Sequence, residues 1–114
     1  MEVQPITVSE YVTGDRRKPF SEWVHSVKDA KTRLVIDKRI ANLRRGTLGD
    51  FKYFDTLLEL RIDYGPGYRI YCGKKGKTYV LLLCGGTKRA QDQDIRTAKA
   101  YWNEHRARSD QHTV

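Results

Sequence analysis

The sequence predicts a small α+β domain in which helices cover one mainly antiparallel sheet. Apolar and polar residues alternate over residues 58–63, which is typical of a strand with one buried face. A continuous apolar run over residues 79–84 indicates a strand that is covered on both faces. Stretches with helical apolar spacing lie on either side of this region. With 114 residues, the chain has the length of one domain, which we place at residues 1–108.

Two helices are expected before the main strands. The first begins at Pro19, because proline suits a first helical turn. Its apolar stripe is interpreted as core rather than as a platform for bases, and consists of Phe20, Trp23, Val24 and Val27. Asp29 is the expected N-cap of a second helix over residues 30–45, and Gly46 is its stop. The two helices are expected to pair and to cover one face of the sheet.

A third helix is expected over residues 90–106, followed by a disordered tail over residues 109–114. A short strand over residues 6–8, with Pro5 at its start, adds an edge to the sheet. The predicted order is therefore β-α-α-β-β-β-α. This order corresponds to two N-terminal helices packed on a mainly antiparallel four-stranded sheet, with a C-terminal helix.

Residues 64–67, with the sequence Tyr-Gly-Pro-Gly, predict a tight reversal of the chain. If the reversal is centred on Pro66, Arg61 lies opposite Tyr71 and Asp63 lies opposite Arg69. Arg61 and Arg69 are then diagonal neighbours on an open polar face, near enough for both to reach one phosphate. A polar outer face is also ordinary for antiparallel strands, so the pattern leaves open a surface without a specific role.

The balance of charge favours a polyanionic partner. The chain carries 22 lysines and arginines against 14 acidic residues, which gives a net charge of +8. Charge alone does not distinguish RNA, DNA and an acidic protein as the partner. The candidate RNA contacts come from a second predicted hairpin turn, the strand before it and the end of the second helix, and are Lys74, Lys75, Lys77, Tyr71 and Arg45.

The signatures of several enzyme classes are missing. The sequence contains no P-loop, HExxH, GxSxG or EF-hand pattern, and its three histidines are scattered, which argues against a histidine-pair ribonuclease. Cys72 and Cys84 fall within predicted strands and are interpreted as reduced, buried thiols of a cytosolic protein, since no CxxC or Cys/His grouping accompanies them. No metal, cofactor, signal peptide or membrane segment is expected.

A set of cations remains as candidate machinery, namely Arg61, Arg69, Lys88 and Arg89. RNA can be cleaved without a metal when its own 2′-hydroxyl attacks the adjacent phosphorus atom. A protein must then align the attack, stabilise charge on the phosphorane oxygens and assist the departure of the 5′-oxygen. Arginines and lysines held on a rigid sheet can supply the electrostatic part of this catalysis.

Three segments resemble the RelE/HigB toxin superfamily, and most closely its HigB-like branch of phage-derived addiction-module killer proteins. They are GTLGDFKYF, LLELRIDYGPGYRIYCG and TYVLLLCGGTKRAQDQDI, and the resemblance runs from about residue 10 to residue 106. It implies a RelE-like fold and a small cytosolic bacterial toxin, inactivated by a co-encoded antitoxin that is usually a helix-turn-helix protein. It further implies an endoribonuclease that cuts mRNA in the A site of the 70S ribosome, without metal or cofactor.

Roles of single residues follow from the resemblance. The family arginine at the scissile phosphate matches Arg69, and the basic residue thought to activate the 2′-hydroxyl matches Arg61. The basic pair near the leaving oxygen matches Lys88 and Arg89. An upstream family lysine falls on Glu59, which reverses its charge.

The base-stacking tyrosine of some RelE proteins has no counterpart in this chain. Asp92, our candidate, or Asp94 could accept a proton there, or either could cap the third helix. The alternative function is a ParE-like toxin that binds a protein target such as DNA gyrase, and an inert RNA-binding module is a third hypothesis. The sequence does not specify the codon preference, the antitoxin, or the stoichiometry of the antitoxin complex through which the toxin would oligomerise.

Overall fold

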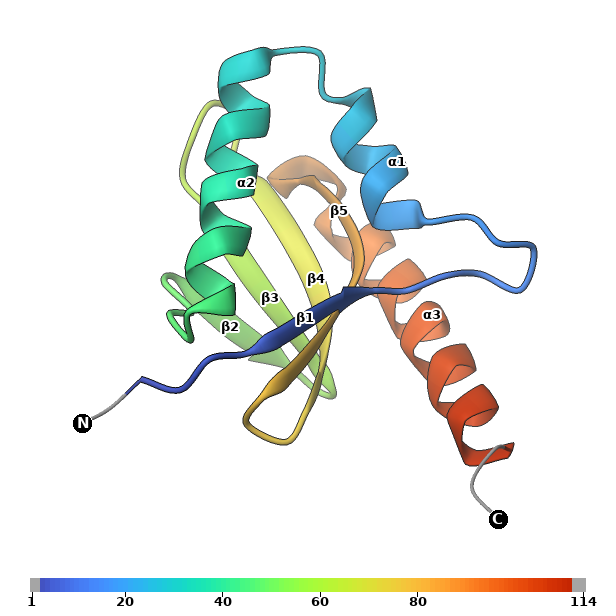
Figure 1. Cartoon of the computed structure of the whole chain (residues 1–114). Coiled ribbons are helices and arrows are strands. Elements are labelled where there is room, and N and C mark those ends of the chain that lie inside the picture. The colour runs from blue at the N-terminus through green and yellow to red at the C-terminus, as the bar shows by residue number, and fades with distance from the viewer. Residues whose placement is uncertain (1–2, 112–114) are drawn as a thin grey trace.

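The fold is a five-stranded mixed sheet with helices on both faces (Figure 1). The structure is a computed structural model that describes residues 3–111. Its strands are β1 (Thr7–Glu10), β2 (Phe51–Phe54), β3 (Leu57–Ile62), β4 (Tyr68–Lys75) and β5 (Tyr79–Thr87). Its helices are α1 (Pro19–Ser26), α2 (Ala30–Arg44) and α3 (Gln91–Gln111), and a 3-10 turn, η1 (Lys88–Ala90), precedes α3. The predicted α+β class with a C-terminal helix is confirmed.

The sheet has one strand more than predicted, so the order of elements differs from the expected one. The strands are arranged β1-β5-β4-β3-β2, with antiparallel pairing throughout except between β1 and β5, which are parallel. The additional strand, β2, pairs with β3 at an edge, and most of its side chains are exposed. The prediction of four strands was wrong because so short and exposed a strand leaves no buried apolar pattern in the sequence.

Each face of the sheet has its own apolar core. On one face, α1 and α2 cover side chains of β3, β4 and β5 that include Leu58, Leu60, Ile70, Cys72, Val80 and Leu82. On the other face, Ala98 and Trp102 of α3 pack on Leu57, Tyr71, Leu81 and Leu83. Because β5 contributes to both cores, the prediction that its apolar run is covered on both faces is confirmed. The stripe of the first helix also belongs to a core, as predicted.

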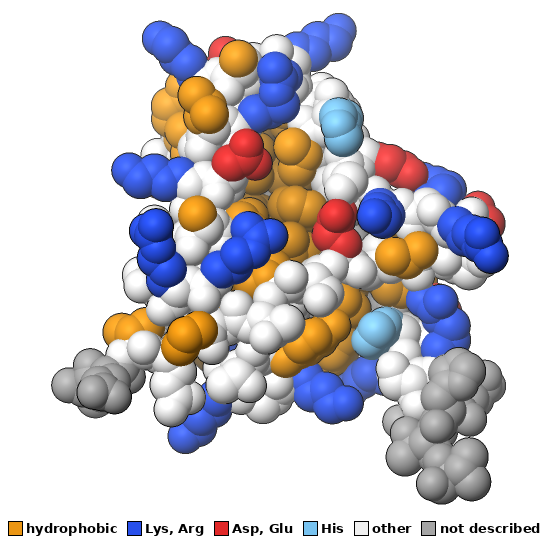
Figure 2. Space-filling view, viewed as in Figure 1, with side chains coloured by type: hydrophobic (Ala, Val, Ile, Leu, Met, Phe, Trp, Pro, Cys, Tyr) orange, Lys and Arg blue, Asp and Glu red, His pale blue; other side chains and the backbone are white. Residues whose placement is uncertain are grey.

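The two N-terminal helices share a face but do not run side by side. Figure 1 shows α1 and α2 diverging from the loop that joins them. A hollow of about 310 Å³ remains where they part, and it is lined by apolar residues such as Val8 and Leu82 together with Glu10 and Asp37. Figure 2 shows apolar side chains in the furrow between the helices. The prediction that both helices cover one face of the sheet is therefore confirmed. The prediction that they pack against each other as an antiparallel pair was wrong.

Local signals begin both of these helices where the sequence predicted. Pro19 occupies the first turn of α1. The carboxylate of Asp29 caps α2, because it accepts hydrogen bonds from the N–H of Lys31 (3.4 Å) and the hydroxyl of Thr32 (2.8 Å). The first bond satisfies a backbone N–H that has no partner within the first turn of the helix, and the second fixes the carboxylate in place.

Helix α3 is longer than predicted. It continues to Gln111, so residues 109–111 of the predicted disordered tail are helical, whereas residues 112–114 lie outside the described residues. Its C-terminal half is fixed to the connector after β1, because Arg108 donates a hydrogen bond to the carbonyl of Val12 (2.6 Å) and Tyr11 donates one to Glu104 (2.7 Å).

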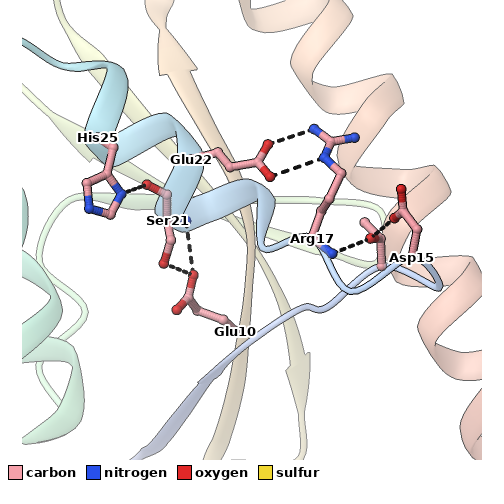
Figure 3. Close-up of polar contacts among 7 residues, drawn as sticks. Glu10, Asp15, Arg17, Ser21, Glu22 and His25 are labelled. Atoms are coloured by element: carbon pink, nitrogen blue, oxygen red, sulfur yellow. Dashed lines mark hydrogen bonds and ion pairs between the residues drawn. The ribbon is translucent and has the colours of Figure 1, made fainter.

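Polar contacts fasten the connector between β1 and α1, as Figure 3 shows. Ser21 donates to one oxygen of Glu10 from its backbone N–H (3.0 Å) and from its hydroxyl (2.5 Å). Arg17 donates two hydrogen bonds to Glu22, at 2.6 and 3.1 Å. The start of α1 is thereby joined both to the end of β1 and to the connector itself.

Two tryptophans rest on glycines of the sheet from opposite faces. A methyl group at Gly85 of β5 would lie 2.3 Å from the ring of Trp23 in α1, and one at Gly73 of β4 would lie 2.2 Å from the ring of Trp102 in α3. Carbon atoms in close-packed interiors stay much farther apart, at about 3.5–4.0 Å. Glycine at these two positions therefore sets how closely α1 and α3 approach the sheet.

Replacing Gly73 or Gly85 by alanine is expected to lower the free energy of unfolding by about 1–3 kcal/mol, because the added methyl group forces an indole ring to shift. Gly14→Ala is the matched control, since nothing lies within 4 Å of a methyl group at that position. Urea unfolding of the three variants measures the effect. Equal stabilities for Gly73→Ala and Gly14→Ala would contradict the close contact of Trp102 with the sheet.

Candidate functional site

Arg61 of β3 and Arg69 of β4 lie directly opposite each other in the sheet. The predicted register, which placed Arg61 opposite Tyr71 and made the arginines diagonal neighbours, was wrong by two residues. A shift of two residues keeps every side chain on its own face, so the two arginines share one face as predicted. Directly opposed residues are also the closest cross-strand neighbours, which brings the two cations nearer than expected.

The turn explains this shift in register. Gly65 and Gly67 both adopt positive φ values, +55° and +84°, and the N–H of Gly67 donates a hydrogen bond to the carbonyl of Tyr64 (3.0 Å). The loop therefore covers residues 63–67 and is centred on Gly65 instead of Pro66. The sequence indicated that both glycines could take a positive φ, but not the residue on which the loop turns.

The carboxylate of Glu59 interacts with both arginines and is fully buried. Nε of Arg61 donates a hydrogen bond to Oε1 of Glu59 (2.9 Å), and Nε of Arg69 lies 3.9 Å from the same oxygen. This negative charge offsets the repulsion between two directly opposed cations. The hydrogen bond also raises the pKa of Arg61, so this guanidinium group stays charged.

The polar face around these residues is covered, and the prediction of an open face was wrong. The first turn of α3 lies over it, where the side chain of Gln91 donates a hydrogen bond to Oε2 of Glu59 (2.8 Å). As a result, the side chain of Arg69 is only 11% exposed and that of Arg61 is 32% exposed. A ligand could therefore reach only the outer part of the two guanidinium groups.

Tyr71 lies beneath α3 and is fully buried, so its prediction as an RNA contact was wrong. The alternation of β4 assigned it correctly to the face of Glu59, its cross-strand partner. That face, however, belongs to the second core. Burial raises the pKa of the Tyr71 hydroxyl, and the neighbouring carboxylate of Glu59 raises it further. Tyr71 is thus a neutral part of the interior.

A hollow of about 280 Å³ opens beside the arginines at the β3–β4 turn. Arg61, Arg69 and Lys88 line it together with the backbone of the turn and two carboxylates. The N–H of Lys88 donates a hydrogen bond to the carbonyl of Gly67 (2.9 Å), which holds the start of η1 against the turn. Arg89 is exposed and does not line the hollow. Three of the four candidate cations therefore gather in one place.

The two candidate aspartates of α3 point in different directions. A methyl group at Gly86, the residue opposite Arg69 on β5, would lie 2.0 Å from Oδ2 of Asp94, so this carboxylate rests on the sheet. Burial raises the pKa of Asp94. Asp92 is exposed in the same helical turn and does not line the hollow. The structure does not bring Asp92, the preferred candidate, to the arginines.

Arg39 of α2 also supports the site, although nothing in the sequence singled it out. Its guanidinium donates hydrogen bonds to the carbonyls of Leu48 (2.7 and 3.1 Å) and Arg61 (2.5 Å). These bonds fix the backbone of Arg61 to a helix on the opposite face of the sheet. Periodicity gave no signal for the role of Arg39, because the carbonyls that it contacts lie on other segments of the chain.

The remaining candidate RNA contacts form a second basic region at the other end of the sheet. Lys74, Lys75 and Lys77 lie at the β4–β5 turn, where Lys75 and Lys77 are exposed. Arg45 is exposed at the C-cap of α2, and the adjacent Gly46 lines a hollow together with Lys74 and Lys77. The structure thus separates this region from Arg61 and Arg69.

Other features of the described chain bear on the class of chemistry. Cys72 and Cys84 are free and buried, as predicted, and burial raises the pKa of Cys84 to about 12. Within residues 3–111, no three His, Cys, Asp or Glu side chains gather as a group that could hold a metal ion. No helix in the part of the chain that the structure describes is long and apolar enough to cross a membrane.

Fold and site together define a small α+β protein with a fixed cationic cluster at one end of its sheet. Over 81 residues, the chain is 43% identical to an uncharacterized protein of Haemophilus influenzae, and this match covers 70% of the chain and 82% of the relative. The chain belongs to the same family as that protein. No protein-family model and no solved structure matches the chain.

Arg69→Ala is expected to lower the free energy of unfolding by about 1–3 kcal/mol, because the buried carboxylate of Glu59 would lose one of the two cations beside it. The same change in a Glu59→Gln background should cost less, since a neutral amide needs no second cation. Urea unfolding of the wild type, both single variants and the double variant gives the coupling energy. A coupling energy near zero would show that the two side chains do not interact.

Asp94→Asn is expected to be more stable than the wild type at neutral pH. Because burial raises the pKa of Asp94, the folded protein holds this proton more tightly than the unfolded chain does. That stabilisation of the wild type is present below about pH 4 and is lost as the pH rises through the folded pKa. The advantage of the variant should therefore disappear in acid.

Thermal unfolding at a series of pH values measures this difference. Asp92→Asn is the control, since Asp92 lies exposed in the same turn and its replacement should only remove about 0.3–1 kcal/mol of favourable interaction with the helix dipole. If Asp94→Asn were less stable than the wild type at neutral pH, the ionised carboxylate would have to be favourably paired within the fold.

Proposed function

We propose that this protein is the toxin of a type II toxin–antitoxin module and that it cleaves mRNA on the ribosome without metal or cofactor. Its motifs resemble the addiction-module killer proteins of the RelE/HigB superfamily, to which we assign it. A co-encoded helix-turn-helix antitoxin would inactivate it. The observation that carries the proposal is the pair of opposed arginines, Arg61 and Arg69, held by one buried carboxylate.

The geometry of this pair suits a phosphodiester. Two guanidinium groups on opposed positions of neighbouring strands can approach the non-bridging oxygens of one phosphate. Pairing in the sheet fixes the backbone positions of both arginines, and the hydrogen bond to Glu59 fixes the inner end of the Arg61 side chain. Little reorganisation is therefore needed when negative charge grows on the phosphorane oxygens. Charge placed in advance in this way stabilises the transition state more than the ground state.

Lys88 would act at the leaving group. In the proposed reaction the 2′-oxygen forms a bond to phosphorus while the bond from phosphorus to the 5′-oxygen breaks. The 2′-hydroxyl loses a proton and the 5′-oxygen gains one, which leaves a cyclic phosphate and a 5′-hydroxyl. Lys88 is exposed and lines the same hollow as the arginines, so its ammonium group can reach the departing oxygen. These cations carry the proposed chemistry, and neither Asp92 nor Asp94 is assigned as the base.

A second candidate function is a ParE-like toxin that binds a protein target such as DNA gyrase. The low exposure of Arg69, 11%, favours it. An arginine that is enclosed in the fold beside an internal carboxylate would serve stability and not catalysis. The exposed Lys88 and Arg89 would then remain for contacts with a protein.

Induced expression of the wild type is expected to arrest growth and to create mRNA 5′ ends only within translated regions. Lys88→Gln should reduce this cleavage roughly tenfold or more, because it removes a charge beside the reacting phosphate. Its side chain is exposed, so the variant should fold like the wild type. Lys38→Gln, at an exposed position of α2, is the control of equal charge. Mapping of 5′ ends, with circular dichroism of the purified proteins, gives the measurement.

Two results would overturn the proposal. Growth arrest with intact message and accumulating DNA breaks would favour the gyrase-binding toxin. Intact message without growth arrest would indicate an RNA-binding module that lacks enzymatic activity. In contrast, cleavage that a neighbouring helix-turn-helix protein suppresses would support both the activity and the partner.

A further inference from the structure

A larger hollow, of about 570 Å³, lies at the end of the sheet opposite to the arginines. Its volume is in the range of small-ligand sites, about 300–1,000 Å³. The β2–β3 turn, the β4–β5 hairpin and the C-terminal half of α3 surround it. Along β4, Lys75 at this hollow is six residues from Arg69, or about 20 Å at the rise of a strand. The hollow is therefore distinct from the site described above.

Three cations border this hollow, namely Lys74, Lys75 and Arg106. Nζ of Lys74 lies 2.9 Å from the hydroxyl of Tyr53 and 5.5 Å from the centre of its ring. The carboxylate that lines the hollow, Asp55, is engaged by Lys99 at 3.3 Å. The hollow thus presents an excess of positive charge, which favours an anionic ligand.

Flat rings lie among these cations. Tyr53 is 50% exposed on the edge strand β2, and Tyr79 is half-buried on β5. His105 stacks on Trp102, with ring centres 5.7 Å apart and 8° between the planes. Burial lowers the pKa of His105, so its ring is neutral at neutral pH and adds surface for stacking instead of charge.

We propose that this hollow binds single-stranded RNA, with a base stacked on Tyr53 and the adjacent phosphates on Lys74 and Lys75. Exposed rings next to cations are the combination by which proteins hold single strands, because each nucleotide offers a flat base and a charged phosphate. An acidic peptide would satisfy the lysines but would leave the exposed ring without a stacking partner. The site extends beyond the proposed cleavage site and requires neither Arg61 nor Arg69.

The test is binding of a fluorescent, unstructured RNA of roughly ten nucleotides to the full chain, followed by anisotropy. Tyr53→Leu should weaken binding at least about fivefold, since stacking on an aromatic side chain contributes about 1–3 kcal/mol per base. Tyr53→Phe keeps the ring and should bind like the wild type. Comparison of these two variants distinguishes the contribution of the Tyr53 ring from that of its hydroxyl, which contacts Lys74.

Charge is tested in the same assay. Lys74→Gln should weaken binding and reduce the slope of log K against log salt concentration by about 0.7, the value for one phosphate contact to a single strand. Lys38→Gln, on α2, should change neither quantity. Cross-linking of the wild type to ribosomes that carry message would then show whether the bound strand is mRNA or ribosomal RNA.

Equal affinities for Tyr53→Leu and Tyr53→Phe, with both proteins folded by circular dichroism, would overturn the stacking proposal. Displacement of the RNA by poly-glutamate at equal concentration of charge would assign the hollow to an acidic protein instead. The assay contains no ribosome and measures no cleavage. Loss of RNA binding in Tyr53→Leu and loss of mRNA cleavage in Lys88→Gln are therefore separate outcomes.

Discussion

The buried carboxylate of Glu59 is the interaction on which the cationic site depends. Antiparallel pairing places Arg61 and Arg69 directly opposite each other, where like charges repel. Glu59 lies on the same face, and its carboxylate accepts hydrogen bonds from Arg61 and from Gln91 of α3. An ionised carboxylate buried without partners would cost several kcal/mol, so the anion and the two cations stabilise one another. The start of α3 is positioned by the same charge.

This charge balance and the turn together specify one register for the hairpin. A slip of one residue would turn Glu59 toward the apolar core beneath α1 and α2, where it would lack a cation. A slip of two residues would keep the faces but separate the opposed arginines. The two positive-φ glycines of the loop oppose both alternatives, and so does the contact of Lys88 with Gly67. Local backbone preference and long-range electrostatics therefore favour the same pairing.

The sequence predicted those features that depend on local spacing, including the α+β class, the starts of α1 and α2, and the face shared by Arg61 and Arg69. It did not predict that α3 covers this face, because alternation shows to which side a residue points but not what packs there. Glu59 and Tyr71 were assigned to an exposed surface for this reason, although both are buried. Strand β2 escaped detection because its side chains are mostly exposed.

The two basic regions at opposite ends of the sheet differ in how their cationic side chains are restrained. This difference suits one region to catalysis and the other to binding. Arg61 and Arg69 are ordered by Glu59 before a ligand arrives, which suits the stabilisation of transient charge. Lys75 and Lys77 are exposed at a hairpin turn and lose rotamer freedom on binding, which suits a modest, salt-dependent attraction for a flexible polyanion. Helix α3 is fixed near one region by Gln91 and near the other by the contact of its tryptophan with the sheet. A rigid helix anchored at both ends keeps the distance between the two regions constant. A strand held by the exposed lysines would therefore reach the fixed arginines at a defined offset.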